Sequence, residues 1–341
     1  MTRNFNTRMV FRTMGALLLI EALFMALALG VSLWYNEADS GVFLLSTIVT
    51  LIAGIIGLLI GIGAESKMGE REGYVIVAMV WVVFSAFGLL PYYLSGQVPT
   101  LTDAWFESMS GFTTTGATII PDLNQITHGL LFWRAISQWI GGMGIIVLSI
   151  AILPIFGLNG MQLYAAEVSG LTYEKLSPRI ADTAKMMWTT YLILTVTEVL
   201  ALWLCGMPLF DAICHSFSTI ATGGFSTKNN SLEFYNSPAI HYTVTFFMFI
   251  SGINFVILIY LLRGKARNFV KDEELRWYSL AVLLFTVILT LGLYIARPGW
   301  AGVNMERAFR DSLFTVVSAM TSTGYTISDY MYWPVVAWVI I

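Results

Sequence analysis

DAWFESMSGFTTTGAT, residues 103–118, is the stretch that decides the fold, because the chain contains two further copies of it. The other copies align without gaps at DAICHSFSTIATGGFS (211–226) and DSLFTVVSAMTSTGYT (311–326). In each copy an aspartate stands thirteen residues before a glycine, and a serine stands six residues before the same glycine. These glycines are Gly116, Gly224 and Gly324. A pattern shared at so many positions predicts an internal repeat.

The composition excludes a water-soluble protein. Hydrophobic residues make up 57% of the 341 residues and charged residues only 11%, whereas a soluble domain carries about 25% charged residues. The net charge of −3 offers no basic surface for nucleic acid, so we expect no nucleic-acid partner. The chain has no G-x-x-x-x-G-K-[ST] motif and no Ser/His/Asp arrangement, so we expect no enzyme activity.

Seven segments are apolar over a length that can cross a membrane, which takes about 20 helical residues. They lie near residues 9–35, 42–64, 74–95, 129–156, 184–206, 238–262 and 277–296. An eighth apolar segment begins at Met331 and stops at Ile341. We therefore expect the chain to end inside a helix.

The basic residues predict the orientation of these spans. Thirteen of the 18 lysines and arginines precede the first span, follow the second, separate the fourth from the fifth, or follow the sixth. An even number of spans separates these segments, so all of them lie on one side of the membrane. An excess of lysine and arginine marks the cytoplasmic side, which places the N-terminus in the cytoplasm.

Each repeat predicts a helix, a short half-helix, a loop and a second helix. The roughly ten residues after the aspartate are too few to span a bilayer, so the half-helix enters from the outer side and stops partway. We expect Asp103, Asp211 and Asp311 to cap the half-helices at their N-termini. Non-helical backbone at membrane depth must be buried in protein or line a wet cavity. The loops are therefore predicted to line a water-filled path.

The chemistry of the loops favours a monovalent cation. The C-terminal end of each half-helix is partly negative, and carbonyl and hydroxyl oxygens can replace the hydration shell of such an ion. A divalent ion would be expected to use carboxylates, and none occurs in the loops. We expect each glycine to adopt a positive φ so that its carbonyl faces inward.

The candidate selectivity filter consists of five residues from each copy. They are Thr113, Thr114, Thr115, Gly116 and Ala117; Ala221, Thr222, Gly223, Gly224 and Phe225; and Thr321, Ser322, Thr323, Gly324 and Tyr325. The candidate K⁺ ligands among them are Thr114, Thr115, Ala221, Thr222, Thr321 and Ser322.

Three stretches carry a resemblance to a known family: GFTTTGATII (111–120), STIATGGFST (218–227) and QWIGGMGIIVLSIAILPIFGLNGMQLY (138–164). On these the chain resembles the Trk/Ktr/HKT family of potassium uptake proteins, in particular its bacterial Trk membrane subunits. The resemblance implies an all-α polytopic membrane protein. Its repeated helix–pore-loop–helix units are arranged pseudo-fourfold around a central pore, and the fourth unit is absent from this chain.

The resemblance also implies a domain organisation and partners. It divides the chain into an N-terminal transmembrane hairpin (1–73), pore repeat 1 (74–182), pore repeat 2 (183–274) and a truncated pore repeat 3 (275–341). It implies K⁺ as the transported ion, with no organic cofactor in this chain. It further implies a homodimer in the bacterial cytoplasmic membrane and a cytosolic nucleotide-binding regulatory subunit.

Alternatives remain open at this point. A Na⁺-permeable or weakly selective relative of the same fold is one, although Gly116 favours K⁺, because in the family a serine at the first filter glycine accompanies Na⁺ permeation. An ion-coupled secondary transporter is another, but it predicts inverted halves, whereas these repeats share one orientation. A non-conducting assembly or sensor protein is the third.

The sequence leaves open the role of three ionisable side chains, one in an apolar span and two in half-helices. Glu198 lies inside the fifth span, where an acid is a functional candidate, either as a relay or as a buried structural partner. Glu107 and His215 occupy equivalent positions of two half-helices. They either pack behind the filter or shape the outer vestibule.

Overall fold

A computed structural model of the chain describes residues 5–64, 70–152, 180–262, 264, 266–296, 305–333 and 337–338. These residues form helices joined by loops, with no strand among them. The α-helices are α1 (Thr7–Trp34), α2 (Ser40–Ile60), α3 (Glu70–Gly88), α4 (Leu90–Leu94), α5 (Leu101–Phe112), α6 (His128–Ile152), α8 (Ile180–Leu204), α9 (Leu209–Ile220), α10 (Pro238–Ser251), α11 (Phe255–Leu262), α12 (Ala266–Lys271), α13 (Glu273–Ala296) and α14 (Met305–Met320). The 3₁₀ helices are η1 (Leu123–Gln125), η3 (Ser231–Phe234) and η4 (Tyr330–Tyr332).

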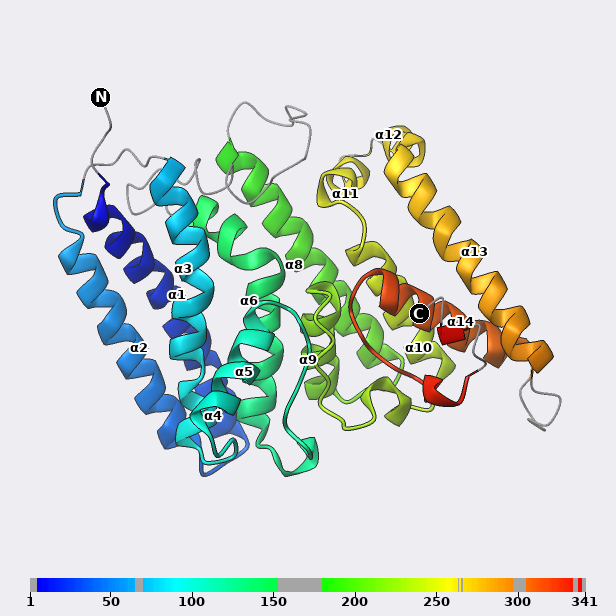
Figure 1. Cartoon of the computed structure of the whole chain (residues 1–341), viewed down its shortest axis with the longest axis horizontal. Helices are drawn as coiled ribbons and strands as arrows, with labels where there is room; N and C mark the ends of the chain where they lie inside the picture. Colours follow the sequence, from blue (N-terminus) through cyan, green and yellow to red (C-terminus); the bar gives the residue numbers. More distant parts are fainter. Residues whose placement is uncertain are drawn as a thin grey trace. The chain divides into compact units, whose positions relative to one another are not determined.

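The chain forms two compact units, residues 1–189 and 190–341, whose helices are labelled in Figure 1. The first unit contains the N-terminal hairpin and the first repeat. The second contains the second and third repeats. The four-part division expected from the sequence is finer than this one and stays a prediction.

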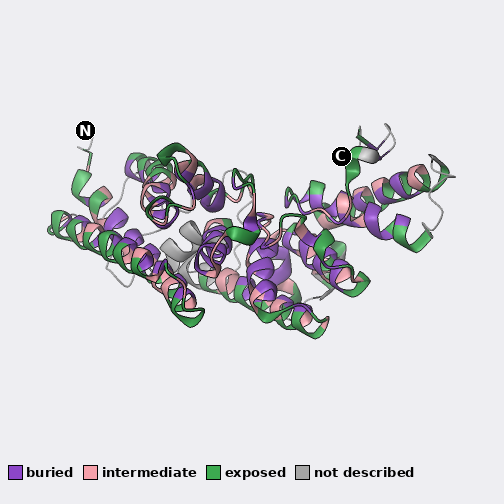
Figure 2. Ribbon diagram, turned by 90° about the horizontal axis from the view of Figure 1, so that it is seen from below, coloured by how far each residue is buried: buried purple, intermediate pink, exposed green. Residues whose placement is uncertain are grey.

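The described helices include five that are long and apolar enough to cross a membrane: 7–34, 40–60, 71–94, 185–204 and 273–295. Their large apolar side chains are widely exposed, and Figure 2 shows green, exposed residues along the long helices. On α2 the exposed apolar residues include Leu44, Leu45, Ile48, Ile52, Ile55, Ile56 and Leu59. A surface of this kind suits a lipid environment and not water.

Two of the predicted spans are divided between helices. The span expected at 74–95 consists of α3 and α4, which meet at Leu89 with helical backbone and together form the membrane-length helix 71–94. Pro91, which lacks an N–H, lies just after this junction. The span expected at 238–262 is not one helix, because α10 ends at Ser251 and α11 begins at Phe255. Gly252 lies at this break, where a Cβ would approach Cγ2 of Thr321 to 2.7 Å.

The N-terminal hairpin packs through glycines. A Cβ at Gly15 of α1 would lie 2.6 Å from the carbonyl oxygen of Gly54 on α2, and one at Gly57 would lie 2.9 Å from Cα of Gly15. Small residues let two membrane helices approach until their backbones touch. The two helices are therefore so close that no larger residue could replace the glycines at these positions.

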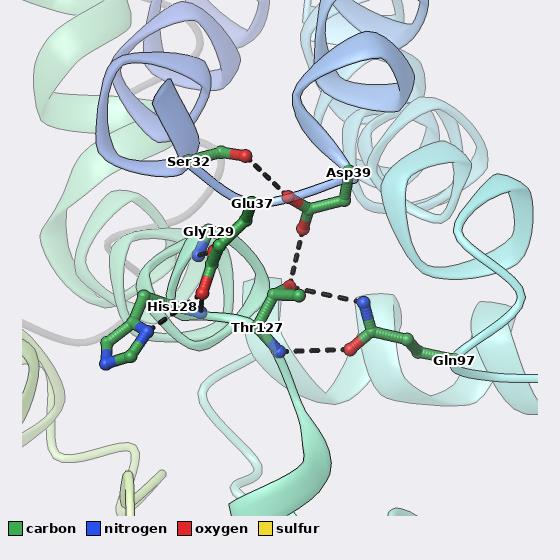
Figure 3. A network of polar contacts seen from close by, with 7 residues as sticks. All are labelled: Ser32, Glu37, Asp39, Gln97, Thr127, His128 and Gly129. Atoms are coloured by element: carbon green, nitrogen blue, oxygen red, sulfur yellow. Dashed lines mark hydrogen bonds and ion pairs between the residues drawn. The ribbon is translucent and has the colours of Figure 1, made fainter. Parts of the chain in front are cut away.

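The turn between α1 and α2 caps the N-terminus of α6. The two carboxylate oxygens of Glu37 accept hydrogen bonds from the backbone N–H groups of His128 (2.8 Å) and Gly129 (3.0 Å), as Figure 3 shows. The His128 ring also contacts Glu37 through Nδ1 and stacks on Tyr35. Free N–H groups and the partial positive charge at a helix N-terminus favour such a carboxylate.

A second carboxylate of the same turn extends this network. Asp39 accepts hydrogen bonds from the hydroxyls of Ser32 and Thr127. Thr127 in turn exchanges hydrogen bonds with the side-chain amide of Gln97 (3.1 and 3.2 Å), which precedes α5. The network thus joins the hairpin to both ends of the segment that contains the first repeat loop.

Substitution of Glu37 by alanine is expected to destabilise the protein by about 1–2 kcal/mol, because two helix-terminal N–H groups lose their acceptor. Thermal unfolding of the purified protein in detergent would show this as a lower melting temperature. Glu274, an exposed glutamate in the first turn of α13, is the matched control. Equal melting temperatures for the two variants would contradict the capping role.

Candidate functional site: the three repeat loops

The three loops share one backbone conformation. We call residues 113–117 loop 1, residues 221–225 loop 2 and residues 321–325 loop 3. The expected positive φ is present at Gly116 (73°), Gly224 (74°) and Gly324 (79°). The hydroxyl residue two positions earlier is also left-handed in every loop, which the sequence did not predict; these residues are Thr114 (54°), Thr222 (53°) and Ser322 (55°).

Left-handed residues at alternate positions change where the carbonyls point. In loop 1 φ is −80° at Thr113 and positive at Thr114 and Gly116. In an extended strand successive carbonyls alternate between opposite sides, whereas a φ that alternates in sign turns them toward one side. A threonine in this conformation is uncommon and strained, and such strain clusters at functional sites. Each loop can therefore present a row of carbonyl oxygens.

Serines of the half-helices hold the loops in place. Oγ of Ser110 donates to the carbonyl oxygen of Ala117 (2.6 Å), and Oγ of Ser318 donates to that of Tyr325 (2.8 Å). The backbone carbonyls of these serines accept from the N–H groups of Thr115 (3.0 Å) and Thr323 (2.9 Å). In repeats 1 and 3 the serine is thus a brace between the end of the half-helix and its loop. In repeat 2 the hydroxyl of Ser218 has no hydrogen-bond partner among the described residues, and only its backbone carbonyl contacts the loop, accepting from the N–H of Gly223 (2.8 Å).

The expectation that the three repeat aspartates are N-caps is wrong. In α5 the cap is Thr100, whose hydroxyl accepts from the N–H of Asp103, and Asp103 lies within the first turn. In α9 Pro208 occupies the cap position and Asp211 also lies in the first turn. Asp311 lies well inside α14, which begins at Met305. The helices begin earlier than the repeat because the preceding residues can also adopt helical backbone.

Asp211 binds the segment that follows loop 2. Its carboxylate accepts from the hydroxyls of Thr227 (2.7 Å) and Tyr235 (2.7 Å) and lies 3.3 Å from Nζ of Lys228. Burial opposes the charge, but the two hydrogen bonds and the lysine outweigh it and lower the pKa of Asp211. At the equivalent position burial instead raises the pKa of Asp311 to about 6, although two arginines act in the opposite direction.

Glu107 and His215 both pack behind their loops and hold the segment that leaves each loop. Glu107 accepts from the hydroxyl of Thr118 (3.0 Å), and Nε2 of His215 lies 3.0 Å from Oγ of Ser226, the equivalent residue. Both side chains are completely buried. This answers the question that the sequence left open, since a residue of the outer vestibule would be accessible.

Sequence reasoning missed the partner of Glu107. Nε of Arg134 on α6 lies 2.7 Å from Oε1 of Glu107, and this arginine is only 1% exposed. The pair joins half-helix α5 to the helix that follows the loop. A signal was present in the sequence, because an arginine inside an apolar span is rare and is expected to be paired.

Glu198 is a further buried acid near the repeats. It is fully buried in α8, and neither of its carboxyl oxygens has a hydrogen-bond partner among the described residues. The two roles that the sequence suggested for Glu198, a relay or a buried structural partner, stay predictions.

Loops 2 and 3 are in direct contact. A Cβ at Gly224 would lie 1.8 Å from the carbonyl oxygen of Thr323, so only a glycine fits there. The N–H groups of Leu232 and Glu233 donate to the carbonyl of Thr326 at 3.1 and 3.2 Å. The two repeats are thus joined at the level of their loops.

Half-helices that end in strained, carbonyl-presenting loops, repeated between apolar helices, define a channel-like ion-transport protein. The comparisons with known proteins agree. The sequence profile of the TrkH family, described as a cation transport protein, matches residues 42–341. The chain therefore belongs to the TrkH family, whose members are membrane transporters and not enzymes.

Individual relatives cover nearly all of the chain. The Trk system potassium uptake protein TrkH of Salmonella typhimurium (strain LT2) is 42% identical over 331 residues, which are 96% of this chain and 68% of the relative. The protein of the same name from Escherichia coli (strain K12) is 40% identical over the same shares.

The match to a solved structure confirms the predicted fold class. The crystal structure of the potassium transporter TrkH from Vibrio parahaemolyticus superposes with a TM-score of 0.85 at 35% identity. The match covers 98% of this chain and 69% of that one. The chain is thus an all-α, channel-like membrane protein.

Proposed function

We propose that the chain translocates potassium ions, as the membrane subunit of a Trk-type uptake system. The observation that carries the proposal is the recurrence of one strained backbone in all three loops, with φ positive at the same two positions. The names of the relatives, which are potassium uptake proteins, support the same ion.

The loops supply the ion ligands in this proposal. Oxygens of Thr114, Thr115, Ala221, Thr222, Thr321 and Ser322 would replace part of the hydration shell of K⁺. These ligands are neutral, and no group of three His, Cys, Asp or Glu side chains suited to a metal ion occurs in the described part of the chain. Neutral oxygens favour a monovalent ion, whose dehydration costs less than that of a divalent ion.

The same proposal places the protein in the bacterial cytoplasmic membrane with its N-terminus in the cytoplasm. The distribution of lysine and arginine supports this orientation. A homodimer and a cytosolic nucleotide-binding subunit that controls the pathway are part of the proposal, and the basic cytoplasmic segments would face that subunit.

Replacing Gly116 or Gly324 by serine is expected to reduce the preference for K⁺ over Na⁺ by roughly tenfold, about 1.4 kcal/mol. Each change forces a residue with a Cβ into a left-handed conformation and shifts the adjacent carbonyl. Uptake of radioactive Rb⁺ with K⁺ and Na⁺ as competitors measures the preference in cells that lack other potassium uptake systems.

Three outcomes separate the competing functions. An unchanged preference in both variants would refute the assignment of the loops as the filter. A wild-type protein that does not distinguish K⁺ from Na⁺ would be a weakly selective relative. Uptake that stops when a proton or sodium gradient is collapsed, at constant membrane potential, would identify a coupled transporter.

A further inference from the structure

The side chain of Tyr325 crosses from loop 3 to loop 2. Its hydroxyl donates to the backbone carbonyl of Phe225 at 3.1 Å and lies 3.3 Å from that of His215. The side chain is 2% exposed, and the backbone carbonyl of the same residue accepts from Ser318. Tyr325 is therefore fixed at both ends, to its own half-helix and to the neighbouring repeat.

This contact is not a feature of the repeat. The residue that follows the loop glycine is Ala117 in loop 1, Phe225 in loop 2 and Tyr325 in loop 3. Alanine and phenylalanine have no hydroxyl, so neither can form the same bond. The sequence alone predicts only that the backbone carbonyl of Tyr325 belongs to the candidate filter, and it gives no role to the side chain.

The bond acts on the peptide next to the loop 2 glycine. A carbonyl that accepts from Tyr325 points toward that side chain, which fixes the peptide plane between Phe225 and Ser226. The plane directly before it carries the carbonyl of Gly224, whose Cα lies against the backbone of Thr323. A rotation of the peptide plane between Phe225 and Ser226 therefore also moves the carbonyl of Gly224 and changes the contact between loops 2 and 3.

We infer that the hydroxyl of Tyr325 is a specificity-determining group. It holds loops 2 and 3 at the separation that suits K⁺ and not the smaller Na⁺. This inference rests on the proposed function of the loops. A buried hydroxyl–carbonyl bond is strong enough to define a position, and the fully buried site excludes water as a substitute donor. Without the bond, the loops can close on a smaller ion.

The test removes only the hydroxyl. Tyr325→Phe keeps the ring, and phenylalanine already occupies the equivalent position of loop 2. The matched control is Tyr235→Phe, which removes another buried hydroxyl of the same unit, one that binds Asp211 at 2.7 Å and not a loop carbonyl. A third variant carries para-aminophenylalanine at position 325, which restores a hydrogen-bond donor.

The readouts are the K⁺ over Na⁺ preference in Rb⁺ uptake and the difference in melting temperature between K⁺ and Na⁺ buffers. Tyr325→Phe is expected to lower the preference about fivefold, the equilibrium effect of one hydrogen bond, and to reduce the K⁺-specific rise in melting temperature. Tyr235→Phe should lower the melting temperature in both buffers and leave the preference unchanged. The aminophenylalanine variant should behave like the wild type.

The Gly116→Ser and Gly324→Ser variants separate this inference from the proposed function. If they lower the preference and Tyr325→Phe does not, the inference is wrong and the filter assignment stands. If none of the three changes has an effect, both are wrong. If the phenylalanine and aminophenylalanine variants lose selectivity equally, the hydroxyl is not the cause and the inference is overturned.

Discussion

Replacing Gly224 by alanine is expected to abolish potassium uptake and to destabilise the protein, whereas the same change at Gly324 is expected to be much milder. Both glycines have nearly the same φ, 74° and 79°, so the conformational cost of about 1–3 kcal/mol is shared. A Cβ at Gly324 meets nothing within 4 Å, while one at Gly224 would lie 1.8 Å from the carbonyl oxygen of Thr323.

The obstacle at Gly224 is backbone, so it cannot rotate away as a flexible side chain could. Loop 3 would have to move, and overpacking of this kind costs roughly a further 1–3 kcal/mol. Rb⁺ uptake and thermal unfolding of the two variants, measured together, give the difference. Equal losses in both would show that loops 2 and 3 are not in contact.

The sequence predicted the features that depend on local composition and on repetition. Five of the seven expected spans match described helices long and apolar enough to cross a membrane. The half-helices end directly before the three loops, as the repeat predicted. Gly116, Gly224 and Gly324 were correctly expected to be left-handed, because a residue without a Cβ is the usual choice there. The confirmed fold class followed from these patterns together with the resemblance to the Trk/Ktr/HKT family.

The sequence did not predict features that arise from contacts between distant segments. The positive φ of Thr114, Thr222 and Ser322 is one such feature, because threonine or serine gives no local signal for this conformation. The close approach of Thr321 to Gly252, at the end of α10, joins residues that lie about seventy positions apart in the chain. The bond of Tyr325 to loop 2 is of the same kind.

The aspartate error illustrates the same limit. Aspartate is a good N-cap in general, but Asp211 instead binds Thr227, Tyr235 and Lys228, all of which follow loop 2 in the sequence. No local rule could choose between the two uses of the carboxylate. In repeat 2 this aspartate therefore holds the segment that follows the loop, and it does not mark the start of the helix.

Separating the buried pair Glu107–Arg134 is expected to cause the second large effect. The two charges are 2.7 Å apart and their side chains are at most 2% exposed, so removing one leaves the other buried without a counter-charge. Such a loss costs about 3–5 kcal/mol. Glu107→Gln and Arg134→Met should therefore each strongly lower the melting temperature and the Rb⁺ uptake.

The double variant distinguishes a buried pair from two independent contributions. With both charges gone, the side-chain amide introduced at position 107 can still accept from Thr118 and from the N–H of Ile119, so the double variant should be more stable than either single one. Glu306→Gln is the control: Glu306 is 47% exposed, so water screens its contact with Arg310 (3.5 Å), and the buried Arg310 keeps the carboxylate of Asp311 at 3.9 Å. If the two single losses simply add in the double variant, Glu107 and Arg134 do not act as a pair. The segment that leaves loop 1 would then depend on the hydrogen bonds to Thr118 and Ile119 alone.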